Sequence, residues 1–79
     1  MKGKVIAVKG DKCIYLTDSG YGYFCDSDFD DLSIGDIIVG SLDEHGESRI
    51  CKQGGSEYFC AYIDAIQMPS LEYALLLLE

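Results

Sequence analysis

The sequence predicts a mainly β protein, a small antiparallel barrel of five to six strands followed by a C-terminal helix. Short segments rich in β-branched and aromatic residues alternate with turns that contain glycine or aspartate, a pattern typical of antiparallel strands. Residues 70–79 are strong helix formers. A chain of 79 residues makes one domain. We expect the barrel to occupy about residues 2–66 and the helix about 69–79.

Each expected strand is an apolar or alternating run that ends at a turn. The first three are joined by tight turns at residues 10–11 and 18–20, which predicts an antiparallel meander. The remaining strands are separated by a longer aspartate-rich segment and by two glycine-containing turns. The expected strands are, in order, residues 4–9, 12–17, 21–25, 37–42, 48–53 and 57–66.

The aspartate-rich segment between the third and fourth expected strands predicts a short helical turn within residues 26–34. Phe29 and Leu32 stand at positions i and i+3, a spacing that places both on one side of a helical turn. That apolar side would cover an end of the barrel. The carboxylates of Asp28, Asp30 and Asp31 form an acidic cluster, which we interpret as a candidate site for contact with another protein.

The C-terminal segment predicts a helix that begins after Met68, with Pro69 at its start. Helical spacing places Leu71, Ala74, Leu75 and Leu78 on one stripe, which we expect to seal the barrel. Tyr73, Leu76 and Leu77 fall on the other side and are candidates for contact with a partner, including a second copy. The alternative is that both stripes are buried within one chain.

The charge balance limits the possible partners. Acidic residues outnumber basic ones by 14 to 6, giving a net charge of -8. This excludes a spread basic footprint for duplex nucleic acid, and we expect no membrane partner because anionic surfaces repel each other. No export signal and no apolar stretch long enough to span a bilayer is visible, so we expect a cytoplasmic protein.

The residue types that carry catalysis or bind metals are poorly arranged for either task. The four cysteines lack the short spacing of structural zinc sites, so we expect reduced thiols. The single His45 lies in a turn without a nucleophile motif. The aspartates from Asp26 onward lack the glycine and glutamate that a calcium loop requires. We therefore expect no enzyme activity, no metal and no cofactor.

Residues 2–53 resemble the S-one RNA-binding domain, a five-stranded OB barrel. The resemblance rests on four phrases: Gly3-Lys4-Val5, Gly22-Tyr23-Phe24-Cys25, Ile34-Gly35-Asp36-Ile37 and Ser48-Arg49-Ile50. It implies an OB-like fold with aromatics that stack on RNA bases. The alternation of Tyr15 and Tyr23 with Ile14, Leu16 and Phe24 predicts that both tyrosines face outward. Cys25 departs from the family pattern, which has histidine there. The residues implied as nucleic-acid contacts are Tyr15, Tyr23 and Arg49, joined by the amino-terminal lysines Lys4 and Lys12.

Three functions are compatible with these observations. The acidic charge and the very apolar C-terminal segment favour a non-enzymatic binding module that docks on another protein or self-associates through its helix. The resemblance favours an alternative, weak binding of single-stranded RNA. A further alternative is an acidic inhibitor or immunity protein that blocks a basic enzyme.

Overall fold

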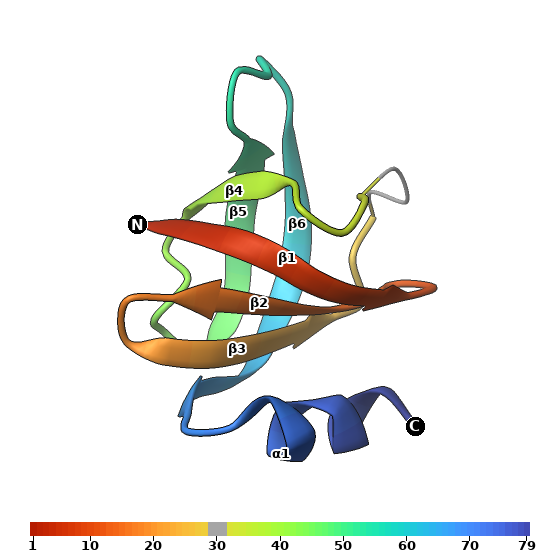
Figure 1. Cartoon of the computed structure of the whole chain (residues 1–79). Helices are drawn as coiled ribbons and strands as arrows, with labels where there is room; N and C mark the ends of the chain where they lie inside the picture. Colours follow the sequence, from red (N-terminus) through yellow and green to blue (C-terminus); the bar gives the residue numbers. More distant parts are fainter. Residues whose placement is uncertain (29–31) are drawn as a thin grey trace.

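Six antiparallel strands close into a barrel, as the sequence predicts (Figure 1). The computed structural model describes residues 1–28 and 32–79. Around the barrel the strands follow the order β1-β2-β3-β6-β5-β4, and β4 pairs back to β1. The strands are β1 (Lys2–Lys9), β2 (Lys12–Thr17), β3 (Gly20–Cys25), β4 (Ile37–Gly40), β5 (Gly46–Lys52) and β6 (Tyr58–Met68).

Two meanders join to make the closed barrel. Strands β1, β2 and β3 pair in sequence through two-residue turns, and β4, β5 and β6 pair in sequence through five-residue loops. Closure comes from the pairing of β3 with β6 and of β1 with β4. Between Val5 and Ala7 the register of β1 shifts, and Ile6 and Ala7 both pack in the apolar cluster outside the barrel.

The interior of the barrel holds one apolar cluster that includes Tyr15. The Tyr15 ring is fully buried, and its hydroxyl donates a 2.6 Å hydrogen bond to the carbonyl oxygen of Leu42. Gly22 and Gly3 lie against this ring and leave room for it. The buried members of this inner cluster are Val5, Cys13, Tyr15, Phe24, Ile38, Leu42, Ile50, Phe59, Ala61 and Ile63.

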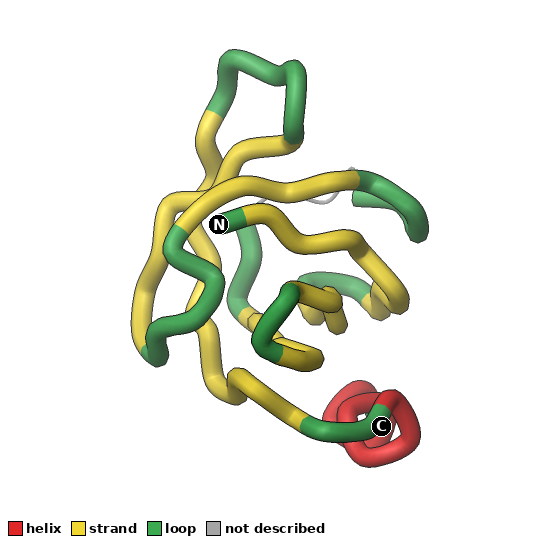
Figure 2. Tube along the Cα trace, turned by 60° about the vertical axis from the view of Figure 1, so that its left-hand side comes forward, coloured by secondary structure: helices red, strands yellow, loops and turns green. Residues whose placement is uncertain are grey.

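A second apolar cluster lies outside the barrel, beneath the C-terminal helix (Figures 1 and 2). Helix α1 (Leu71–Leu75) continues into a 3-10 turn, η1 (Leu76–Leu78). The hydroxyl of Ser70 caps α1 by accepting a 3.1 Å hydrogen bond from the amide of Tyr73. The buried residues of this outer cluster are Ile14, Tyr23, Met68 and Ala74.

Several local expectations need correction. The C-terminal helix is confirmed, but Leu75 is exposed and Leu77 packs on the barrel, the reverse of the expected stripes. The 3-10 turn causes the exchange, because its period of three residues continues the spacing of Leu71 and Ala74 to Leu77. The helical turn expected within residues 26–34 is not seen in the described residues 26–28 and 32–34. The remainder, including Phe29, lies outside the described residues.

Candidate interaction surfaces

The outer side of the C-terminal helix carries large apolar side chains that are only partly covered by the rest of the chain. Tyr73 and Leu76 have exposed fractions of 59% and 60%, and Leu75 has 39%. We call these three residues the helix face. Leu77, a predicted contact residue, is half-buried against the outer cluster and does not belong to this face. The helix therefore has one side fixed on the barrel and one apolar side in solvent.

Two carboxylates belong to the helical segment that carries the helix face. Glu72 lies in the first turn of α1, and Glu79 follows the 3-10 turn. Burial beneath the helix raises the pKa of the Tyr23 hydroxyl, and the nearby Asp64 carboxylate raises it further. Burial and Asp26 likewise raise the pKa of the Cys25 thiol. This end of the molecule therefore combines an apolar face with negative charge.

The aromatic pair expected to stack on bases is buried, and the expectation that both rings face outward is correct for Tyr23 and wrong for Tyr15. Tyr15 points into the barrel, where its hydroxyl is held by Leu42. Tyr23 does lie on the outer surface of β3, but the C-terminal helix covers it. The helix thus occupies the sheet face on which the resemblance to the S-one domain places RNA.

A basic and aromatic surface lies on the side formed by β4, β5 and the start of β1. Lys2 pairs with Val39, Val39 with Cys51, and Cys51 with Tyr58, so these residues form one row across four strands. The Tyr58 ring is 63% exposed, and the guanidinium carbon of Arg49 lies 5.1 Å from its centroid. This row and Arg49 make up what we call the basic face.

A hollow of about 390 Å³ opens on the basic face. Its floor contains apolar and thiol groups, and two lysines stand among its walls. Its lining residues are Lys2, Val39, Gly40, Cys51, Lys52, Gln53, Gly54, Gly55 and Tyr58. No carboxylate occurs among these described residues. A second hollow of about 450 Å³ adjoins it at Lys2 and Gln53 and reaches Lys4.

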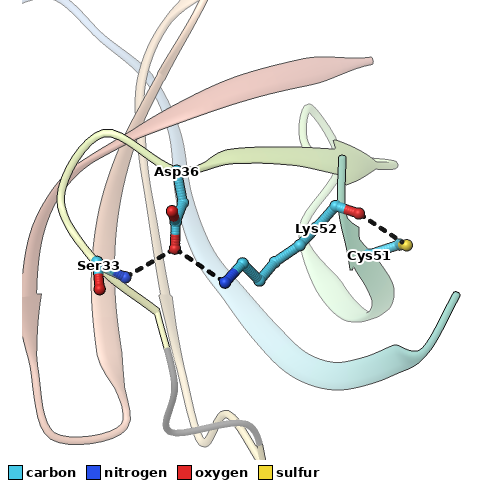
Figure 3. Close-up of polar contacts among 4 residues, drawn as sticks. All are labelled: Ser33, Asp36, Cys51 and Lys52. Carbon is cyan, nitrogen blue, oxygen red and sulfur yellow. Dashed lines mark hydrogen bonds and ion pairs between the residues drawn. The ribbon is translucent and has the colours of Figure 1, made fainter. Parts of the chain in front are cut away.

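The Lys52 ammonium is held in place by the Asp36 carboxylate (Figure 3). Lys52 is also one of the residues that line the first hollow. Its ammonium nitrogen lies 3.3 Å from a carboxylate oxygen of Asp36, and the same oxygen accepts a 2.9 Å hydrogen bond from the Ser33 amide. The Ser33 amide, helped by Lys52, holds the pKa of the Asp36 carboxyl below its usual range. The thiol of Cys51 donates to the carbonyl oxygen of Lys52 at 3.2 Å.

The structure brings together only part of the predicted nucleic-acid set. Lys4 pairs with Ile37 on β4 and is exposed, on the same side of the barrel as Arg49. Lys12 pairs with Lys9 at the other end of β1 and is distant in the sheet from Lys4. The sequence analysis missed Tyr58. Its position after the turn at Gly54 and Gly55, opposite a strand that carries arginine, was the available indication.

The predicted acidic cluster is described only in part. The Asp28 carboxylate accepts a 2.9 Å hydrogen bond from the amide of Cys60, and the Asp28 amide donates to the Cys60 carbonyl oxygen at 3.1 Å. Asp28 thus fastens its loop to β6 while its side chain stays exposed. Asp30 and Asp31 lie outside the described residues. Within residues 1–28 and 32–79, no group of three histidine, cysteine or acidic side chains is placed to hold a metal ion.

Comparisons with known proteins return no match among protein-family models, curated proteins or solved structures. The described part of the chain also contains no helix of the length and apolarity that crossing a membrane requires.

Proposed function

We propose that this protein is a non-enzymatic binding module that docks on another protein through the helix face. The observation that carries the proposal is the exposure of Tyr73, Leu75 and Leu76 on a helix whose other side is fixed. Grouped large apolar side chains on a small protein mark interaction sites. The barrel and its helix are compatible with an OB-like scaffold, and we include that scaffold in the proposal.

The size of the helix face indicates how it would act. Complete burial of a large apolar side chain is worth about 1.5–3 kcal/mol, and these side chains are already partly buried. Covering all three would therefore contribute about 3–5 kcal/mol. Association costs on the order of 4–15 kcal/mol in lost freedom. The helix face is thus an anchor, and the charged surface around it has to supply the rest.

Site-specific photo-crosslinking in cells tests this proposal. A photoreactive side chain at position 73 should form adducts with another protein, and a Leu76→Glu substitution in the same chain should remove them. A photoreactive side chain at Glu44, exposed in the β4–β5 loop, is the matched control. Adducts no stronger than those of the control would refute the proposal. So would a Leu76→Glu variant that unfolds, because the side chain would then belong to the core.

The basic face supports a second candidate function, weak binding of single-stranded RNA. Exposed aromatic rings stack on bases, and lysine and arginine neutralise phosphates. Tyr58 with Arg49 supplies this combination on the side of the barrel away from the helix. Titration of a labelled oligonucleotide should show binding that weakens about tenfold in Tyr58→Ala and is unchanged in Tyr62→Ala. Equal binding by both variants would exclude the site.

A further inference from the structure

We infer that one occupant of the helix face is a second copy of this chain, which receives the helix face in the hollow on its basic face. This inference rests on the proposed function, because it names a partner for the same helix face. The contact is head-to-tail: each copy offers a helix face at one end and a hollow at the other.

The positions of the two surfaces exclude contact within one chain. The helix covers the outer side of β2, β3 and β6, whereas the hollow lies beside the β5–β6 loop. In both views the helix and this loop lie at opposite ends of the barrel (Figures 1 and 2). The helix face can therefore enter a hollow only on another molecule. Such a heterologous contact leaves a free surface at each end, so repeated association forms a ring where the rotation closes and an open chain where it does not.

Charge selects this arrangement over a symmetric pairing of two helix faces. A symmetric pair would bring the carboxylates of Glu72 and Glu79 on one copy toward the same carboxylates on the other. The helical segment 71–79 contains no basic residue to offset them. The hollow offers the opposite charge at Lys2, with no carboxylate among its lining residues, whereas Asp36 balances the charge of Lys52. Like charges placed opposite each other suppress a pairing, and complementary charges favour it.

The polarity of the two surfaces also matches. The lining of the hollow includes Val39, Cys51 and the exposed ring of Tyr58, which are suitable neighbours for leucine and tyrosine side chains. The hollow is shallow and open to solvent, so it can receive side chains of a partner without a change in the barrel. The contact is small, and small contacts are reversible and weak. Self-association should therefore rise with concentration and produce a distribution of oligomer sizes.

Sedimentation velocity over a concentration series tests the inference, with variants that separate local contact from net charge. The average sedimentation coefficient of the wild type should increase with concentration. Glu72→Lys and Lys2→Glu should each weaken association tenfold or more, and both should stay folded.

Two controls make the same change in net charge elsewhere: Glu44→Lys matches the first variant, and Lys9→Glu matches the second. Both controls should associate like the wild type. Because Glu72→Lys lowers the net negative charge, a general charge effect would strengthen association instead.

A mixing experiment isolates the head-to-tail geometry. Leu76→Glu keeps an intact hollow, and Lys2→Glu keeps an intact helix face, and the two altered surfaces repel each other. Mixed together, they should form a one-to-one complex that grows no further. A wild type that stays monomeric, a mixture without complex, or variants that associate like their controls would overturn the inference. If adducts to other proteins at position 73 persist while the wild type stays monomeric, self-docking fails and the proposed function stands. Absence of both adducts and self-association refutes both.

Discussion

Replacing Gly22 with alanine tests the account of the barrel interior. Gly22 pairs with Tyr15 across β2 and β3, and the Tyr15 ring lies over the glycine. A Cβ added at Gly22 would lie 2.5 Å from the Tyr15 hydroxyl oxygen and still closer to two ring carbons. The ring cannot swing aside easily, because its hydroxyl is bonded to Leu42 and its face packs on Phe24 at a centroid distance of 5.9 Å.

The expected loss of stability follows from this overlap. Overpacking a well-filled core costs 1–3 kcal/mol and sometimes more, and the approach of Gly22 to Tyr15 places this variant at about 3 kcal/mol. The free energy of unfolding of a domain of this size is about 4–12 kcal/mol. Gly22→Ala should thus lose a large fraction of the total. The Tyr15→Leu substitution removes the side-chain atoms that the new methyl group would meet. In that background, Gly22→Ala should lower the free energy of unfolding by less than about 1 kcal/mol, a coupling typical of residues in contact.

Urea unfolding followed by circular dichroism measures these values. Gly55→Ala is the control, because Gly55 lies in an exposed turn where only the Lys52 carbonyl oxygen and Cβ lie near the new methyl. It should change the free energy of unfolding by less than about 1 kcal/mol. A Gly22→Ala variant as stable as Gly55→Ala would refute the reasoning. The reasoning would also be refuted if Gly22→Ala lowered the free energy of unfolding equally in the wild type and in the Tyr15→Leu variant.

Four further predictions address other parts of the molecule. Tyr15→Phe should lower the free energy of unfolding by about 1–3 kcal/mol, measured by urea unfolding, because the buried carbonyl of Leu42 loses its partner. In the same assay, Leu77→Asp should lower the free energy of unfolding by about 1–3 kcal/mol, because Leu77 packs on the barrel. Leu76→Asp should lower it by less than about 0.5 kcal/mol, because Leu76 is exposed. The folded-state pKa of Asp36 is lowered, so the wild type should be more stable than Asp36→Asn above the carboxyl's usual pKa. Urea midpoints should show this advantage disappearing as the pH falls through the lowered pKa. Burial raises the pKa of Cys13 to about 12, so a thiol reagent at neutral pH should modify Cys13 only as fast as the barrel opens, as mass spectrometry of labelled peptides would show.

The barrel could be predicted from the sequence because each strand ends at its own turn. The sequence could not show which side chains of β2 point into the barrel. Residues Cys13, Ile14 and Tyr15 are all buried, so both faces of this strand are apolar and alternation cannot show which one faces inward. The outer face of β2 is covered by the C-terminal helix, which lies more than fifty residues later in the sequence. No local pattern reveals that a distant segment will fold back onto this strand.

For the candidate surfaces as well, features set by neighbouring residues could be predicted, and features set by contacts between distant segments could not. The helix itself followed from helix formers and from Pro69 at its start, but its exposed side depended on the change to a 3-10 turn at Leu76. Arg49 and Tyr58 meet through the hairpin of β5 and β6, a pairing that the sequence suggests. The row from Lys2 to Tyr58 requires barrel closure between β1 and β4, which only the assembled fold provides.

The helix that covers Ile14 and Tyr23 also constrains how the chain can fold during synthesis. Hairpins of β1, β2 and β3 can form as soon as they leave the ribosome, and β6 completes the wall later. Through all of this the outer surface of β2 and β3 stays uncovered, because residues 71–78 are translated after every strand. A nascent barrel therefore displays an apolar sheet to its neighbours until its own last turn arrives. Residues 1–68 contain twelve acidic and six basic residues, and mutual repulsion between chains of this charge would keep the completed but uncovered barrels apart during that interval.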